Sequence, residues 1–254
     1  TNIYLMIVLQ KTKILFFLLL FFVGCATENN NIDIKGDTIN TVPGVSNNSK
    51  DQHSSNDLDE AESITISNIM DDYGSYIHKY SKRYGFDWRL ILAIIKQESN
   101  FTNYAESHKG ALGLMQIMPQ TGKSLADELD LEEVISPRNN IAAGIYYLWK
   151  LSESFKYADE NNKLKLALAA YNCGLSRIQD AQDIVRYNKG NPYNWDEVSE
   201  ALKKLSKDYS ELHQKVWDIP KPPGGYFDNY AQPINYVDNV IKYYNRYQVT
   251  IAYK

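Results

Sequence analysis

The residue best suited to acid–base chemistry is a glutamate that follows an apolar run. Residues 90–95, Leu-Ile-Leu-Ala-Ile-Ile, are apolar on every face of a helix, and Glu98 follows within one turn. A helix that is apolar all round lies in a protein core. Its apolar wall would raise the pKa of a carboxyl above the usual value of about 4.3 and let it act as a general acid. Taken alone, however, a glutamate at a helix end is more often a solvated charge.

Glu98 lies in the first of three short motifs along the chain. Residues 97–101 read Gln-Glu-Ser-Asn-Phe, residues 113–119 read Gly-Leu-Met-Gln-Ile-Met-Pro, and residues 169–174 read Ala-Ala-Tyr-Asn-Cys-Gly. Each is modest by itself. In this order and spacing they resemble the goose-lysozyme-like transglycosylase domain of soluble lytic transglycosylases. The resemblance covers about residues 68–247 and implies a mainly α-helical, lysozyme-like domain with a substrate groove.

The resemblance also implies roles for single residues. Glu98 matches the family's catalytic carboxylate. The matched substrate-binding positions are Ser107 near the sugar N-acetyl group, Gln116 and Met118 in the groove, Tyr171 with its hydroxyl close to the carboxylate, its neighbour Asn172, and Tyr236 of the C-terminal motif. For Ser107 and Met118, packing is the alternative. Gln232 stands where the family commonly has Glu, which puts a charged partner for the groove in doubt.

The C-terminal part is similar to the catalytic module of F-type membrane-bound lytic transglycosylases. The matching residues are Asn191-Pro192, Trp195, Gly225-Tyr226, Tyr236-Val237 and Tyr243-Tyr244. This implies cleavage of peptidoglycan glycan strands between MurNAc and GlcNAc, with 1,6-anhydroMurNAc ends, a single carboxylate and no metal or organic cofactor. The alternatives are a goose-type muramidase, in which water attacks, and a non-catalytic peptidoglycan-binding lipoprotein.

Two other groups of residues offer different chemistry. Cys173 with His108 or His213 suggests a thiol nucleophile, but a small packed thiol is the simpler interpretation. Five acidic residues between positions 127 and 133 offer a second carboxylate, whereas such a charge-rich helix end and turn usually faces solvent. We therefore expect neither group to carry the chemistry.

Helices must position these motifs. An apolar stripe at three- and four-residue steps from Ile66 to Tyr84 predicts a helix with Gly85 as its C-terminal cap. Asp87 is the expected N-cap of a buried helix ending at Glu98, and Ser136-Pro137 begins another. Further helices are expected at 163–172, 175–187, 195–206 and 229–247, and no alternating strand pattern occurs.

Composition bounds the class of protein. The 254 residues carry a net charge of −4, which argues against a nucleic-acid partner. The 20 tyrosines suit half-buried packing or stacking on sugars. The two cysteines form no zinc-like cluster. We expect a monomer.

The N-terminal segment resembles a lipoprotein signal. Lys11 and Lys13 precede ten apolar residues, whereas a membrane-spanning helix needs about 20. The run ends at Cys25 in a sequence similar to a lipobox. We expect a signal peptide at 1–25, lipidation of Cys25, a polar tether at 26–63 and a catalytic domain at 64–254. Because Ala26 is not a retention aspartate, the expected location is the outer membrane, facing the periplasm.

Overall fold

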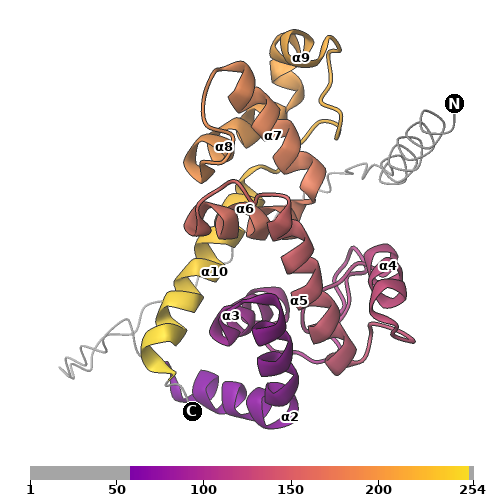
Figure 1. Cartoon of the computed structure of the whole chain (residues 1–254), viewed down its shortest axis with the longest axis vertical. Coiled ribbons are helices and arrows are strands. Elements are labelled where there is room, and N and C mark those ends of the chain that lie inside the picture. The colour runs from indigo at the N-terminus through magenta and orange to yellow at the C-terminus, as the bar shows by residue number, and fades with distance from the viewer. Residues whose placement is uncertain (1–57, 252–254) are drawn as a thin grey trace, which may run out of the picture. The chain divides into compact units, whose positions relative to one another are not determined.

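The computed structural model describes residues 58–251, which are folded almost entirely into helices (Figure 1). The α-helices are α2 (Glu60–Tyr84), α3 (Trp88–Ser99), α4 (Pro119–Leu129), α5 (Pro137–Glu153), α6 (Glu160–Cys173), α7 (Leu175–Tyr187), α8 (Trp195–Leu202), α9 (Ser210–Trp217) and α10 (Ala231–Thr250), with 3-10 turns at Lys203–Leu205 and Lys207–Tyr209. Over the same residues, β structure is limited to two isolated bridges. The prediction of a mainly α-helical domain is confirmed.

Some of the predictions concern residues beyond this range. The signal peptide at 1–25, its Cys25 and residues 26–57 of the tether lie outside the described residues. The structure differs from the expected tether at its end, because residues 60–63 are the first turn of α2. Asp59 caps this turn by accepting a hydrogen bond from the Glu62 backbone N–H at 2.7 Å. Within residues 58–251, no helix is both long and apolar enough to cross a membrane.

Most of the expected helix ends are found. Gly85 ends α2 in the left-handed conformation, with φ of 77°, and the Asp87 carboxylate caps α3. Helix α5 begins at Pro137 as predicted, but the Ser136 side chain makes no cap. Instead the Glu133 carboxylate accepts the Ser136 backbone N–H at 2.8 Å. The expected helix at 195–206 changes to a 3-10 turn after residue 202.

Helices α4 and α9 were not predicted from the sequence. Helix α4 buries only Gly122, Leu125 and Ala126, and α9 buries only His213. A short helix with so few buried residues has a weak apolar stripe. Its sequence is therefore hard to distinguish from that of a loop.

Helix α3 packs against α2 and α10 (Figure 1). Residues 90–95 are each at most 2% exposed, and they join a core that includes residues of α5, α6 and α10. Full burial of one leucine or isoleucine side chain contributes about 1.5–3 kcal/mol. Burial on all sides therefore holds α3, and with it the residues at its end, firmly in place.

A buried carboxylate joins the first and last helices of the domain. Glu62 of α2 is 7% exposed and accepts a hydrogen bond from the Tyr247 hydroxyl of α10 at 2.6 Å. Arg246 of α10 forms an ion pair with the same carboxylate, and the Lys96 ammonium of α3 lies 3.5 Å from it. Three helices thus meet at one charge, which needs these partners because an unpaired buried carboxylate is costly.

Asn140 fixes the loop between α3 and α4. This fully buried side chain of α5 accepts the Met115 backbone N–H at 2.8 Å and donates to the Leu112 and Val134 carbonyls at 3.0 Å each. Gly113, with φ of 79°, passes so close that an added Cβ would lie 2.6 Å from the Asn140 amide. One side chain therefore supplies hydrogen-bond partners to three backbone groups of the loops on either side of α4.

Replacing Asn140 should destabilise the whole domain. The Asn140→Ala variant leaves buried backbone groups of the loop without partners, and each such group costs about 1–3 kcal/mol. We expect the free energy of unfolding to fall by about 2–4 kcal/mol, measured by chemical denaturation. Asn239→Ala, the same change at an exposed position of α10, is the control. Equal effects of the two substitutions would contradict the role assigned to Asn140.

Candidate active site

Glu98 lies in the last turn of α3, where the chain turns away at once. Asn100 follows in the left-handed conformation, with φ of 47°, and its backbone N–H donates to the Lys96 carbonyl. The Ser99 hydroxyl donates to the Ile95 carbonyl at 3.1 Å. The Lys96 ammonium bonds to the Asn100 side chain at 2.7 Å and so points away from Glu98, as its helical spacing predicts. The Glu98 carboxyl is therefore left at the end of an apolar helix without a cation beside it.

The hydrogen-bond partner of Glu98 comes from the far end of the chain. The Tyr236 hydroxyl of α10 donates to the Glu98 Oε1 at 2.6 Å. Tyr236 is 4% exposed, so this bond lies within the protein. Burial raises the pKa of Glu98 from its ordinary value of 4.5 to about 7, and the Tyr236 hydroxyl opposes this rise by stabilising the carboxylate.

A carboxyl with a pKa near 7 can serve as both acid and base at neutral pH. Its protonated and ionised forms are similarly populated there, so the group can give up a proton and take one back. An ordinary surface glutamate is ionised at this pH and cannot act as the acid. The solvated-charge alternative for Glu98 does not fit this environment.

Tyr171 lies near Glu98 but donates its hydrogen bond elsewhere. Its hydroxyl bonds to the Met115 carbonyl at 2.8 Å, and its ring lies 5.4 Å from that of Tyr147 on α5. Burial and then the Glu98 carboxylate raise the pKa of Tyr171 well above its ordinary value. Tyr171 thus lies close enough to Glu98 to be influenced by its charge, while the tyrosine bonded to Glu98 is Tyr236.

The three predicted groove residues between α3 and α4 lie on one loop. The Ser107 hydroxyl accepts the Ala111 backbone N–H at 2.9 Å and closes a turn. The Gln116 amide donates to the Ala105 and Gly113 carbonyls at 3.1 and 2.9 Å. Met118 is 43% exposed. Ser107 and Gln116 therefore shape the loop, and Met118 offers an apolar side chain to solvent.

Two asparagine side chains have unused hydrogen-bonding capacity. The amide oxygens of Asn172 and Asn103 are buried, and neither accepts a hydrogen bond from the residues that the structure describes. Buried polar atoms of this kind are uncommon and call for a partner. Asn172 was predicted as a site residue. Asn103 was not, although it follows Glu98 by only five residues, and proximity to the motif was the one available signal.

The structure separates the parts of a thiol site. Burial raises the pKa of Cys173 to about 12, which keeps the thiol protonated. The thiol donates a hydrogen bond to the Gly174 carbonyl at 3.9 Å. His213 is fully buried in α9, with its Nε2 2.7 Å from the Lys204 carbonyl. His108 is exposed on a loop. The packing interpretation of Cys173 agrees with this environment.

The acidic residues between 127 and 133 lie mostly at the surface. Glu128 is exposed and pairs with Lys150 at 2.6 Å, while Glu133 is engaged at the start of α5. Gln232, in the first turn of α10, is exposed and bonds to Asn229. Neither a second carboxylate from this run nor Gln232 joins Glu98 in the hydrogen bonds of residues 58–251.

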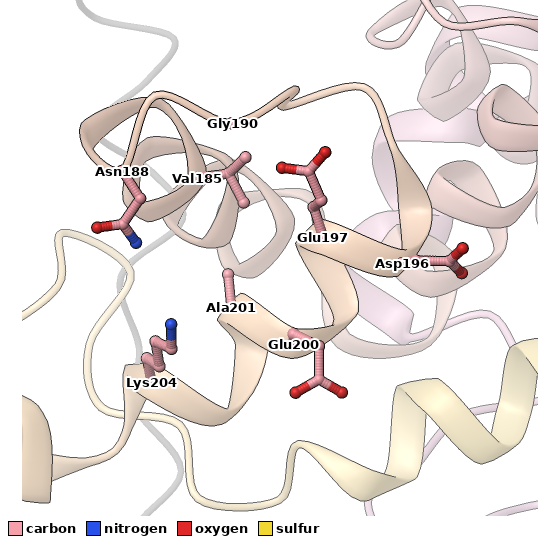
Figure 2. Close-up of a pocket in the computed structure, with 8 residues that line it drawn as sticks. All are labelled: Val185, Asn188, Gly190, Asp196, Glu197, Glu200, Ala201 and Lys204. Carbon is pink, nitrogen blue, oxygen red and sulfur yellow. The ribbon is translucent and has the colours of Figure 1, made fainter.

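A hollow of about 410 Å³ lies apart from these residues, between α7 and α8 (Figure 2). Of the three acidic residues that line it, Glu197 accepts the Asn191 backbone N–H at 3.0 Å. Gly190 passes so close that an added Cβ would lie 2.1 Å from the Glu197 carboxylate. The carboxylate thus holds a turn, and no predicted site residue lines the hollow. Across residues 58–251, no group of three or more His, Cys, Asp or Glu side chains is arranged to hold a metal ion.

The fold and the site define a mainly α-helical domain in which Glu98, at the end of a core helix, has a raised pKa. Residues 75–194 match the family model described as the transglycosylase SLT domain. These residues are thus similar to the transglycosylase SLT domain. The match confirms the predicted resemblance to the transglycosylase SLT domain.

Similar proteins carry the name membrane-bound lytic murein transglycosylase F. That of Desulfosudis oleivorans is 40% identical over 50% of this chain and 27% of its own length. That of Serratia proteamaculans is 32% identical over 74% of this chain and 35% of its own. The chain thus spans about a third, or less, of these relatives.

Two solved structures are also similar. An inactive mutant of the lytic transglycosylase Slt from Pseudomonas aeruginosa is 27% identical, with a TM-score of 0.48, over 69% of this chain and 24% of that one. The 70 kDa soluble lytic transglycosylase of Escherichia coli is 21% identical, with a TM-score of 0.46, over 70% of this chain and 24% of that one.

Removing the Tyr236 hydroxyl should raise the pKa of Glu98 further. A hydrogen bond to a charged group contributes about 1.5–3 kcal/mol, so Tyr236→Phe should shift the Glu98 titration upward by about 1–2 pH units. The titration is measured by NMR of the carboxyl carbon. Tyr171→Phe is the control, because its hydroxyl bonds to Met115, and it should shift Glu98 much less. Equal shifts, or a downward shift in Tyr236→Phe, would contradict this assignment.

Proposed function

We propose that this domain is a peptidoglycan lytic transglycosylase with Glu98 as its single acid and base. The observation that carries the proposal is the buried Glu98 carboxyl, with its pKa near 7 and the Tyr236 hydroxyl at 2.6 Å. The match of residues 75–194 to the SLT domain and the names of the relatives support the reaction class. The substrate is the β-1,4 bond between MurNAc and GlcNAc in glycan strands.

In the first step Glu98 acts as the acid. The protonated carboxyl donates its proton to the glycosidic oxygen, and the bond from that oxygen to C1 of MurNAc breaks. The bonding electrons leave with the GlcNAc oxygen, and the substrate's N-acetyl group stabilises the positive charge at C1. Glu98 becomes a carboxylate, which the Tyr236 hydroxyl stabilises by its hydrogen bond.

In the second step the same group acts as the base. The Glu98 carboxylate takes the proton of the MurNAc C6 hydroxyl, and the C6 oxygen forms a bond to C1. This closes the 1,6-anhydro ring, restores the protonated Glu98 and consumes no water. An intramolecular hydroxyl has an effective molarity of up to about 10⁵–10⁸ M, which favours it strongly over water.

Two alternatives differ in what they require. A muramidase that inverts or retains configuration needs, in most families, a second carboxylate to orient water or attack C1. The exposed acidic run near Glu128 and the bonded Gln232 are poor candidates for that group. A non-catalytic binding lipoprotein would have no use for the catalytic carboxylate that Glu98 matches in the family's motif.

For the location, we propose attachment to the cell envelope through a lipid on Cys25. The relatives' name, membrane-bound, supports the coarser statement of an envelope location. The apolar run that ends at Cys25 supports the lipid anchor, and Ala26 supports the outer membrane. A monomer is proposed as the active form.

Products will distinguish the two reactions. The purified chain should release muropeptides that end in 1,6-anhydroMurNAc from sacculi, identified by mass spectrometry, without heavy oxygen from labelled water. Glu98→Gln keeps the shape but cannot cycle a proton, so the rate should fall by roughly 10²–10⁴ or more. Glu132→Gln, an exposed glutamate of the acidic run, is the matched control and should keep the parent rate.

Stability measurements exclude a trivial loss of fold in the Glu98→Gln variant. The folded-state pKa of about 7 lies above the ordinary 4.5, so ionisation of Glu98 destabilises the parent as pH rises through about 7. At pH 8 the neutral variant should be as stable or more stable, by up to about 3 kcal/mol. Reducing ends labelled with heavy oxygen would favour the muramidase, and full activity of Glu98→Gln would refute the role of Glu98.

The lipid anchor has its own test. Cys25→Ser should abolish incorporation of labelled fatty acid and leave an unprocessed or detergent-independent form, because serine lacks the thiol that is acylated. Cell fractionation and the mass of the mature chain measure this outcome. Cys173→Ser is the control and should keep the label. Unchanged fractionation and labelling of Cys25→Ser would count against acylation at this residue.

A further inference from the structure

A single residue joins the helix that carries Tyr171 to the next helix. Helix α6 ends at Cys173 and α7 begins at Leu175, with Gly174 between them at φ of 91° and ψ of 145°. Tyr171 therefore lies in the last turn before the joint, and Arg177 in the first turn after it. Because the joint is so short, the start of α7 is closely coupled in position to the segment beside Glu98.

The face of α7 that follows this joint holds a distant loop through two charged side chains. Asp180 is 4% exposed, and its Oδ2 accepts the Gly224 backbone N–H at 2.9 Å. The Arg177 guanidinium donates to the Gly225 carbonyl and lies 5.4 Å from the centroid of the Phe227 ring. Arg177 and Asp180 are three residues apart, which places them side by side on one face of the helix.

At residue 224 the loop backbone lies so close to the Asp180 and Arg177 side chains that only glycine fits without a shift. A Cβ on Gly224 would lie 2.6 Å from the Asp180 Oδ2 and 3.4 Å from the Arg177 Nη1. The first distance is shorter than side-chain contacts in proteins allow. The backbone of residues 222–227 is thus seated directly on the charged pair.

The same loop leads into the helix that carries Tyr236. The Phe227 backbone N–H donates to the Leu205 carbonyl at 3.0 Å, and α10 begins at Ala231 without a side-chain cap. Tyr236 lies in the second turn of α10. The start of this helix therefore takes its position from its packing and from the loop that Asp180 and Arg177 hold.

We propose that Asp180 and Arg177 are positioning residues that set Tyr236 relative to Glu98 and Tyr171. The Gly174 joint connects α7 to the segment of Tyr171, and Asp180 and Arg177 connect α7 to the loop before Tyr236. The positions of both tyrosines beside Glu98 therefore depend on the same face of α7. The proposal rests on the proposed function only in taking Glu98 as the reacting carboxyl. Neither residue touches substrate in this role.

The charges around Asp180 are few and can be named. Arg177 and Asp183 act on it from α7, Cys173 lies near Arg177 from α6, and Lys221 approaches the loop at Gly225. Burial raises the pKa of Asp180 to about 7, against the lowering effects of the Gly224 N–H and Arg177. Removing its negative charge would by direct electrostatics lower the pKa of Glu98. Displacing the Tyr236 hydroxyl would instead raise it, so the sign of the shift separates the two causes.

The test is an NMR titration of the Glu98 carboxyl carbon in the full chain, assigned by its absence in Glu98→Gln. Asp180→Ala removes the acceptor, and Gly224→Ala pushes the loop away from the other side. Each should raise the midpoint of the Glu98 titration by about 0.5–1 pH unit. This is part of the shift expected when the whole hydrogen bond from the Tyr236 hydroxyl is lost. Asp228→Ala, in the same loop and exposed, is the matched control and should leave the midpoint unchanged.

Coupling to Tyr236 makes the test specific. In a Tyr236→Phe background, Asp180→Ala should add no further upward shift, because the hydroxyl it positions is already gone. An unchanged or lowered midpoint in Gly224→Ala, or an upward shift that persists without the Tyr236 hydroxyl, would overturn the proposal. If Asp180→Ala does not fold, Gly224→Ala alone supplies the comparison. The titration needs no turnover, so failure to find anhydro products would count against the proposed function alone.

Discussion

The hydrogen bond between the Tyr236 hydroxyl and the buried Glu98 carboxyl is the interaction on which the rest of the site depends. Two opposing effects meet there. Burial disfavours the carboxylate and raises its pKa, while the hydroxyl stabilises the carboxylate and limits that rise, and the balance lies at about 7. A more exposed Glu98 would be an ordinary carboxylate, and a Glu98 without a donor would release its proton too reluctantly to act as the base. The helices around it maintain this balance.

The two partners lie 138 residues apart in the chain, so only the packing of helices can bring them together. Helix α3 is fixed by its own burial, and α10 packs against it. The shared partners of Glu62 hold the other end of α10 close to α2 and α3. Charged and polar contacts are thus placed at both ends of α10, while apolar packing holds its middle. This arrangement suits a helix that must present one hydroxyl accurately.

Several polar residues near the site have a structural use within the protein. Ser107 and Gln116 close and support the loop that contains Met115, and Tyr171 binds the carbonyl of Met115. Their assignment as substrate-binding residues remains a proposal, since a side chain that shapes a loop can also face a ligand. All of these features lie in a region that corresponds to about a third, or less, of the length of the relatives.

The sequence by itself determined the class of the fold and the identity of the central carboxyl. A helix apolar on all sides must be buried, which made a raised pKa of Glu98 plausible. The resemblance of three motifs to the transglycosylase family then singled out Glu98 against the alternative of a solvated charge. The caps at Gly85 and Asp87 were predicted because their chemistry is local. Helices α4 and α9 were missed because their buried faces are too small to give a clear period. That Tyr236 bonds to Glu98, that Asn140 holds the loop and that Asp180 is buried against Gly224 were decided only by the tertiary structure. Each of these contacts joins residues far apart in the chain, and a hydrogen bond between such residues depends on helix packing that no local pattern encodes.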